Sequence, residues 1–302
     1  MVKVYINQGK DEIETTIKIL EKAKPKIGEK VLIKPNLTMP YSSKLNICTS
    51  PKVIEGIIRY LKCNGIKDII IGEGAGGAKN MSKHFKITGY KRLSDKLNIP
   101  LINLNKDKKV KLKIKRGNYL KEINIAKTVL DRYVINVPKM KTHRMSITTL
   151  SMKNMMGTIL PYNKKAILHP LYFKFMHKAL KEKRVLTEKE FKIVQEEFFK
   201  RLADFYFVLK PQLNIIDAFT GREGDGLTKE YGKSVKFGYV LLSESILAID
   251  YVGTSLMDLK PFDTYLKNLK SKIKNIKIIS NKPLNKIRKK FKPILLTEKI
   301  KI

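Results

Sequence analysis

Three runs of sequence between residues 30 and 74 decide the fold class: KVLIKPN (30–36), SPKVIEGIIRYLKCNG (50–65) and DIIIGEG (68–74). The first run is short and apolar and ends at a proline, which is typical of a buried strand. In the second, Ser50 suits the N-cap and Pro51 the first helical position, and apolar residues recur at helical spacing until Asn64-Gly65. The third run predicts another buried strand. This order predicts two parallel strands joined by a crossover helix.

The same alternation extends to both sides of this segment. We predict further strands at 2–6, 100–104, 133–137, 213–216, 237–242 and 276–279. We predict further helices at 12–23, 89–97, 174–209, 246–256 and 266–274. The pattern therefore predicts an α/β fold, with a mostly parallel mixed sheet and helices on both of its faces.

In residues 110–125 the hydrophobic residues recur with a different period. Val110, Leu112 and Ile114 alternate with lysines, which is typical of a half-buried strand. Gly117-Asn118 predicts a two-residue turn into a return strand. We expect this hairpin at an edge of the sheet, where lysines also discourage aggregation.

The chain divides into a domain and an extension. We assign residues 1–260 to the α/β domain, with a helical insertion at about 160–210. We assign residues 261–302 to a basic C-terminal extension. A division of the domain into two lobes near residue 130 is also compatible with the alternation.

The composition is that of a folded protein without a membrane span. Hydrophobic residues make up 43% of the 302 residues and aromatic residues 8%, which argues against disorder. No apolar run approaches the roughly 18 residues that a membrane span needs. The N-terminus resembles a strand and an acidic helix start rather than a secretory signal. We therefore expect a cytoplasmic protein with no membrane partner.

The net charge of +36 admits two interpretations. A basic surface attracts nucleic acid or phosphorylated molecules. A chain rich in Lys and Ile and without Trp is also typical of a hyperthermophile, but 27 acids face 63 bases, which leaves an excess. Residues 260–302 hold 14 Lys and Arg against two acids, so much of the excess lies in the extension.

The two cysteines exclude several kinds of site. Cys48 and Cys63 cannot supply a disulfide framework or an intrinsic four-cysteine iron–sulfur cluster from one copy of the chain. We expect Cys63 to be buried in its helix. Cys48 lies in a loop before a helix, where a reactive role is the alternative.

Polar residues gather just beyond the carboxyl ends of the predicted strands, where parallel sheets bind ligands. The loop GEGAGG (72–77) has neither the Rossmann nor the P-loop spacing. Ammonium groups with amide donors suit a phosphate or carboxylate, so we predict an anion site. Its predicted ligand-binding residues are Lys34, Asn36, Glu73, Lys139, Lys141, Thr142, Lys153 and Asn154.

Two histidines and three acids add candidate chemistry. His143 and His169 lie in loops and are candidate acid–base catalysts, with a pKa near neutrality. Asp217, Glu223 and Asp225 are candidate ligands of a divalent metal, or would orient a histidine. No zinc motif or nucleophile elbow is present.

The order of these motifs resembles the uncharacterised family known as domain of unknown function 362. The resemblance runs through KPNL (34–37), TSP (49–51), GE (72–73), VPKMKTH (137–143), SMKNMMG (151–157), His169, IDA (216–218), GDG (224–226) and ID (249–250). It implies an α/β fold and one site shared by these loops. Many relatives resemble iron–sulfur proteins because they carry appended ferredoxin-type cysteine motifs, which this chain lacks.

Three hypotheses of function follow. The first is an enzyme that binds an anionic small molecule, with a divalent metal as a candidate cofactor. The second is a protein that binds RNA or DNA through its basic surface and extension. The third is a redox accessory protein that docks an acidic iron–sulfur partner.

Overall fold

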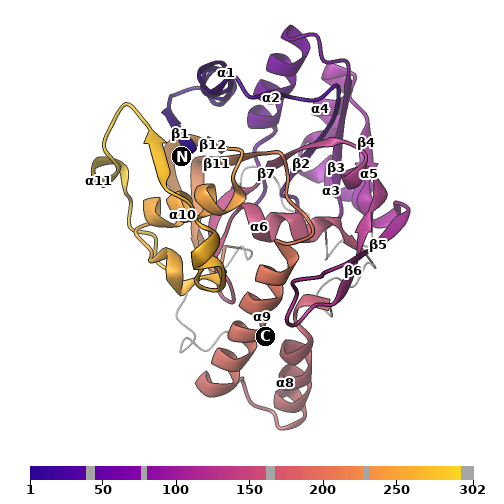
Figure 1. Ribbon diagram of the computed structural model, residues 1–302, viewed down its shortest axis with the longest axis vertical. Coiled ribbons are helices and arrows are strands. Elements are labelled where there is room, and N and C mark those ends of the chain that lie inside the picture. The colour runs from indigo at the N-terminus through magenta and orange to yellow at the C-terminus, as the bar shows by residue number, and fades with distance from the viewer. Residues whose placement is uncertain (39–44, 76–79, 161–166, 227–230, 294–302) are drawn as a thin grey trace.

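A computed structural model of the chain describes residues 1–38, 45–75, 80–160, 167–226 and 231–293. Figure 1 shows the elements arranged around one large twisted sheet. The strands of this sheet run in the order β13-β1-β12-β11-β7-β2-β3-β4, and β8 pairs with β11 and β9. Their bounds are β1 (Val2–Gln8), β2 (Lys30–Pro35), β3 (Asp68–Glu73), β4 (Leu101–Asn103), β7 (Tyr133–Val137), β8 (Lys139–His143), β9 (Ile147–Thr149), β11 (Leu213–Gly224), β12 (Gly232–Ser243) and β13 (Ile276–Ile279).

The helices and a second small sheet complete the fold. The helices are α1 (Glu12–Ala23), α2 (Pro51–Cys63), α3 (Met81–Ile87), α4 (Tyr90–Leu97), α5 (Lys127–Leu130), α6 (Ser151–Asn154), α8 (Pro170–Lys181), α9 (Glu188–Phe205), α10 (Ile246–Leu256) and α11 (Leu284–Ile287). Short 3₁₀ helices are η2 (Leu104–Lys106), η3 (Met155–Thr158), η4 (Pro261–Asp263) and η5 (Tyr265–Lys272). The second sheet contains β5 (Lys109–Lys113), β6 (Glu122–Ala126) and β10 (Ile159–Leu160).

The main sheet is mixed and mostly parallel, as predicted. β2 lies parallel to β3 and β7, while β12 lies antiparallel to β1 and β11. Alternate residues of β2 enter different cores: Val31 and Ile33 pack with α1 and α2, and Leu32 packs on the side of α9 and α10. Helices therefore cover both faces of the sheet (Figure 1).

The local signals at the start of α2 are confirmed. Ser50 is the N-cap, its hydroxyl accepts a hydrogen bond from the Lys52 amide, and Pro51 is the first helical residue. The buried side of α2 carries the predicted apolar residues, including Val53, Ile57 and Leu61. Cys63 was placed wrongly, because it is exposed at the end of the helix while Cys48 is buried.

The predicted hairpin forms, but with a different turn and in a different sheet. β5 and β6 pair with each other, and β6 also pairs with β10, so the hairpin lies apart from the main sheet. Residues 114–121 form a wide loop instead of a two-residue turn at Gly117-Asn118. The carboxylate of Asp204 in α9 accepts hydrogen bonds from the amides of residues 118, 119 and 120, which fixes this loop.

Residues 261–293 are part of the fold rather than a separate extension. β13 pairs in parallel with β1 at the edge of the main sheet. Phe291 is 1% exposed and packs against Phe237. A Cβ atom at Gly221 would lie 2.6 Å from the Phe291 ring, so the glycine allows this contact. Residues 294–302 of the predicted extension lie outside the described residues.

The predicted helical insertion contains two helices in place of one. α8 ends at Lys181, and α9 begins after Thr187, which forms a capping box with Glu190. In Figure 1 these helices extend away from the main sheet. No helix in the described part of the chain is both long and apolar enough to cross a membrane.

Candidate anion-binding site

The carboxyl ends of β2, β3 and β7 meet at one edge of the main sheet. These strands are parallel neighbours, so the polar residues that follow them lie close together. The residues after β7 were predicted as a loop, which is wrong. They form β8, because β11 continues alongside them and the Asp217 amide donates to the Pro138 carbonyl oxygen at 2.9 Å. Of the glycine loop, residues 76 and 77 lie outside the described residues.

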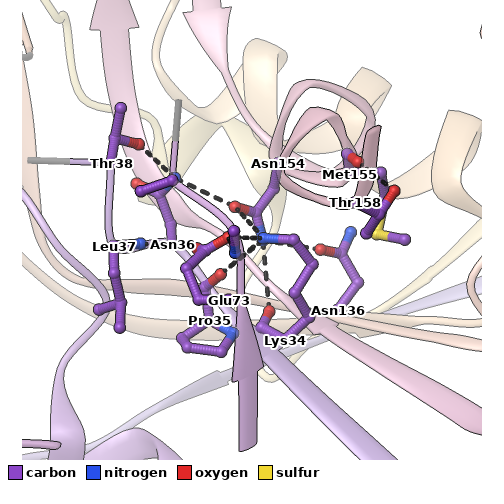
Figure 2. A network of polar contacts seen from close by, with 12 residues as sticks. Lys34, Pro35, Asn36, Leu37, Thr38, Glu73, Asn136, Asn154, Met155 and Thr158 are labelled. Atoms are coloured by element: carbon purple, nitrogen blue, oxygen red, sulfur yellow. Dashed lines mark hydrogen bonds and ion pairs between the residues drawn. The ribbon is translucent and has the colours of Figure 1, made fainter. Parts of the chain in front are cut away.

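Lys34 and Glu73 form a buried ion pair at the centre of this edge (Figure 2). Lys34 Nζ lies 2.8 Å from Glu73 Oε1 and also donates to the Pro35 carbonyl oxygen at 3.0 Å. The other carboxylate oxygen, Oε2, accepts from the Leu37 amide at 2.9 Å. Burial lowers the pKa of Lys34, and the charge of Glu73 opposes this shift. The ion pair therefore holds the loop after β2 against the end of β3.

Three asparagines continue the network across the sheet, as Figure 2 shows. Asn36 Nδ2 donates to Asn154 Oδ1 at 3.0 Å, and Asn154 Nδ2 donates to Asn136 Oδ1 at 2.8 Å. Asn136 in turn donates to the Ser151 carbonyl oxygen at 3.0 Å. Each of these side chains is at most 5% exposed. The amides satisfy one another, so this part of the network is a rigid scaffold.

Asp250 of α10 positions the segment that carries Lys153 and Asn154. Its carboxylate accepts hydrogen bonds from the amides of Ser151 and Met152 at 2.7 and 2.9 Å and from the Tyr265 hydroxyl at 2.8 Å. Burial raises the pKa of Asp250 to about 6. The two amides belong to the first turn of α6, so Asp250 fixes where this helix begins.

Asp250→Ala is expected to lower the free energy of unfolding by about 3 kcal/mol, because three buried donors lose their acceptor. Urea unfolding measures this loss. Asp95→Ala removes a carboxylate from an exposed ion pair with Lys91 and is the control, with almost no expected change. Equal losses in the two variants would contradict the role given to Asp250.

Lys141 is a buried cation whose hydrogen-bond acceptors are neutral. Its Nζ atom donates to Asn36 Oδ1 and to the Ile47 carbonyl oxygen, both at 2.8 Å, and the residue is 0% exposed. Burial lowers the pKa of Lys141 from 10.5 to about 8. The charges of Lys139 and Arg222 lower it further, while Cys48 and Asp225 have the opposite effect. The pKa of this ammonium group is therefore close to neutral pH.

Lys139, by contrast, has a full counterion. Its Nζ atom lies 2.9 Å from Asp217 Oδ2, and both side chains are almost completely buried. Asp217 Oδ2 also accepts from the Ser50 amide at 2.8 Å, and Ser50 Oγ donates to Glu12 Oε2 at 2.9 Å. Burial, and next the charge of Asp217, raises the pKa of Glu12. Lys139 thus ties β8 to β11 and to the start of α2.

His143 was predicted to titrate near neutrality, which the structure contradicts. Its Nδ1 atom accepts from the amides of Met145 and Ser146 at 3.0 and 3.3 Å, so the ring proton lies on Nε2. Burial, and then the charge of Lys153, lowers the pKa of His143 well below 6.5. The ring is therefore neutral at pH 7, and its Nε2–H group is a donor rather than a base.

Three further predicted residues are His169, Lys153 and Thr142. The first two lie near His143, and the third holds β11 in place. His169 is 8% exposed, stacks on Phe198 with ring centroids 4.2 Å apart, and is among the groups whose charge acts on His143. Lys153 lies in the single turn of α6, and its positive charge lowers the pKa of His143. Thr142 donates to the Gly224 carbonyl oxygen at 2.7 Å, so its hydroxyl secures β11.

The three acids predicted to hold a metal do not come together. Asp217 pairs with Lys139, Asp225 lies 3.0 Å from Arg144, and Glu223 accepts from the Lys292 amide. Asp217 lies within β11 rather than at its end, because β11 continues to Gly224 alongside β12. Among the described residues, no group of three or more His, Cys, Asp or Glu side chains could hold a metal ion.

The residues predicted for the site leave out three that build it: Asn136, Glu12 and Asp250, although Asp250 belongs to the ID motif of the family resemblance. Asn136 had a usable signal, because a lone amide inside an apolar strand requires buried partners. Asp250 lies in the apolar helix α10, where a carboxylate requires donors for the same reason. Glu12 resembled an ordinary acidic residue in the first turn of a helix, and no local signal indicated that it lies beside Ser50.

Most of the segments that carry this site lie within the part of the chain that resembles known proteins. A sequence profile described as "Domain of unknown function (DUF362)" matches residues 31–255. The thylakoid-associated protein sll1697 of Synechocystis sp. is 25% identical over 244 residues, which cover 78% of this chain and 65% of that protein. The solved lactate racemase apoprotein of Thermoanaerobacterium thermosaccharolyticum has a TM-score of 0.41 and 11% identity, over 78% of this chain and 54% of that one. The chain thus spans about two thirds of the length of the Synechocystis protein and about half of the length of the racemase.

Proposed function

The chain belongs to the family described as domain of unknown function (DUF362), and from its strand-end site we propose that it binds a small molecule with a phosphate or carboxylate group. We further propose that it is an enzyme in which Lys141 exchanges a proton with this ligand. The buried, neutrally partnered ammonium of Lys141 carries the proposal.

An ammonium group has three donors and, when buried, needs a counterion to offset the loss of hydration. Lys141 has two neutral acceptors and no carboxylate within hydrogen-bond distance in the described chain. Lys34 and Lys139, which lie at the same sheet edge, each have such a carboxylate. An anionic ligand would give Lys141 the counterion that Glu73 gives Lys34 and that Asp217 gives Lys139.

The groups near Lys141 favour the same ligand. The charge of Lys141 acts on His143, which places the neutral imidazole in its vicinity. The Nε2–H of His143 can donate to an anion without a change of protonation. Lys153 adds positive charge on the side of His143. A pKa of about 8 lets Lys141 accept or release a proton close to neutral pH.

Binding of pyrophosphate and of citrate to wild type and to Lys141→Met tests the proposal. Calorimetry at fixed, low ionic strength is expected to show that the variant binds the preferred anion at least tenfold more weakly, because a charge-assisted contact contributes about 1.5–3 kcal/mol. Mass spectrometry of small molecules retained by the natively purified protein identifies the physiological anion.

Lys18→Met is the matched control, since Lys18 forms an exposed pair with Glu14 on α1. It removes the same charge from the whole protein and is expected to leave binding unchanged. The proposal fails if Lys141→Met and Lys18→Met bind both anions equally well while both variants remain folded by circular dichroism.

The hypotheses of nucleic-acid binding and of docking to an iron–sulfur protein remain predictions from the charge. The cytoplasmic location likewise remains a prediction from the sequence. Deletion of the predicted extension is not a clean test of the first, because it removes β13 from the main sheet. The predicted metal does not enter the proposal.

A further inference from the structure

A cavity lies beside the strand-end network, between the start of α1 and helices α2 and α4. Its volume is about 590 Å³, which is within the range of small-molecule sites. Its lining includes Glu12, Ser50, Lys52, Glu55, Arg92 and Lys96. The cavity therefore brings cations and carboxylates from three helices together.

Some of these charges already neutralise one another. Glu55 is bound by Arg59 on its own helix and by Lys96 of α4, whose Nζ atom lies 2.7 Å from Glu55 Oε1. These contacts lower the pKa of Glu55 against the effect of its burial. Glu55 therefore already has two cationic partners and is not available to a ligand.

Two cations in the lining have no such partner. The Lys52 ammonium and the Arg92 guanidinium make no hydrogen bond or ion pair within the described residues. Both side chains are exposed, so they are free to reorient toward a ligand. A guanidinium is the side chain best suited to bind a carboxylate through two parallel hydrogen bonds.

Glu12 lines the same cavity and carries a negative charge, for which a ligand would have to supply a donor or a cation. Its Oε2 atom accepts from the Ser50 hydroxyl, and no cationic group forms an ion pair with this carboxylate in the described chain. Burial, and next the charge of Asp217 behind Ser50, raises the pKa of Glu12 more than the Ser50 hydrogen bond and the charges of Lys139 and Lys52 lower it. A donor from a ligand, above all an ammonium group, would relieve both effects.

We propose that this cavity binds a zwitterionic small molecule of the amino-acid type, with its carboxylate at Arg92 and Lys52 and its ammonium at Glu12. A simple dianion fits less well, because Glu12 would repel it. The proposal goes beyond the anion site at Lys141 and does not depend on it, since the two sites share no ligand-binding side chain.

The probes are unbranched ω-amino acids from glycine to 6-aminohexanoate, which present the two charges at increasing separation. Each is compared with the carboxylic acid and the amine of the same length. Calorimetry on the full-length protein is expected to find at least one amino acid that binds at least tenfold more tightly than both of its singly charged analogues. The proposal is overturned if no member of the series exceeds both analogues.

Two substitutions locate the binding. Arg92→Gln and Glu12→Gln are each expected to weaken binding of the preferred amino acid about tenfold, as loss of a charge-assisted contact predicts. The amide in Glu12→Gln can still accept from Ser50, so the helix start is preserved. Lys91→Gln is the control, because Lys91 neighbours Arg92 but pairs with Asp95 and does not line the cavity.

The outcomes separate this site from the one at Lys141. Unchanged binding of the preferred amino acid in Arg92→Gln and Glu12→Gln would overturn the proposal. Loss of amino-acid binding in Lys141→Met, with full binding in Arg92→Gln, would also overturn it. Loss of anion binding in Lys141→Met alone concerns the other site only.

Discussion

Raising the pH from 8 to 10.5 is expected to stabilise the wild-type protein by about 3 kcal/mol relative to Lys141→Met. The pKa of Lys141 falls from 10.5 to about 8 on folding, because the ammonium is buried beside other cations. Between these pH values the unfolded chain binds a proton at Lys141 that the folded chain has released. Stability therefore rises with pH across this window, and below pH 8 the full cost of burying the charge remains.

Urea unfolding of both proteins at several pH values measures this difference. Other lysines and tyrosines titrate in the same range, but they do so in both proteins and cancel in the comparison. Lys18→Met serves again as the control and is expected to follow the wild type. A difference between wild type and Lys141→Met that is independent of pH would show that Lys141 has an ordinary pKa and would remove the main support for the anion site.

Gly157→Ala is expected to lower the free energy of unfolding by about 3–5 kcal/mol, the cost of disrupting a buried ion pair. A Cβ atom at this position would overlap Glu73 Oε1 and would lie 2.7 Å from Lys34 Nζ. Both side chains are held by further buried hydrogen bonds, so they cannot move aside at little cost. The glycine of the KNMMG motif is therefore required by close approach to the Lys34–Glu73 pair.

Gly28→Ala is the matched control, since its Cβ atom would meet Tyr133 no closer than 3.3 Å. A change of less than about 1 kcal/mol is expected there. Thermal or urea unfolding of the two variants distinguishes the cases. Equal effects at the two glycines would mean that steric overlap with the ion pair does not limit position 157.

The strand ends predicted which polar side chains lie together, while ligand binding by them stays a prediction. Lys34, Asn36, Glu73, Lys141 and Asn154 were all predicted there, and the structure joins them in one hydrogen-bonded network. The position follows from chain order, because parallel strands place the residues after them at one edge. The three acids predicted as metal ligands do not gather at a strand end. Asp217 was expected at the end of its strand, but the antiparallel neighbour β12 extends β11 beyond it.

The sequence by itself determined the strand–helix alternation, the start of α2 at Ser50-Pro51 and the faces on which apolar residues pack, because these depend on residues a few positions apart. The tertiary structure alone decided which lysines have a carboxylate partner. Lys139 meets Asp217 across 78 residues of chain, while Lys141, two positions later, meets neutral oxygens. Burial and charge pairing arise from groups distant in sequence, so no local pattern could distinguish these two lysines.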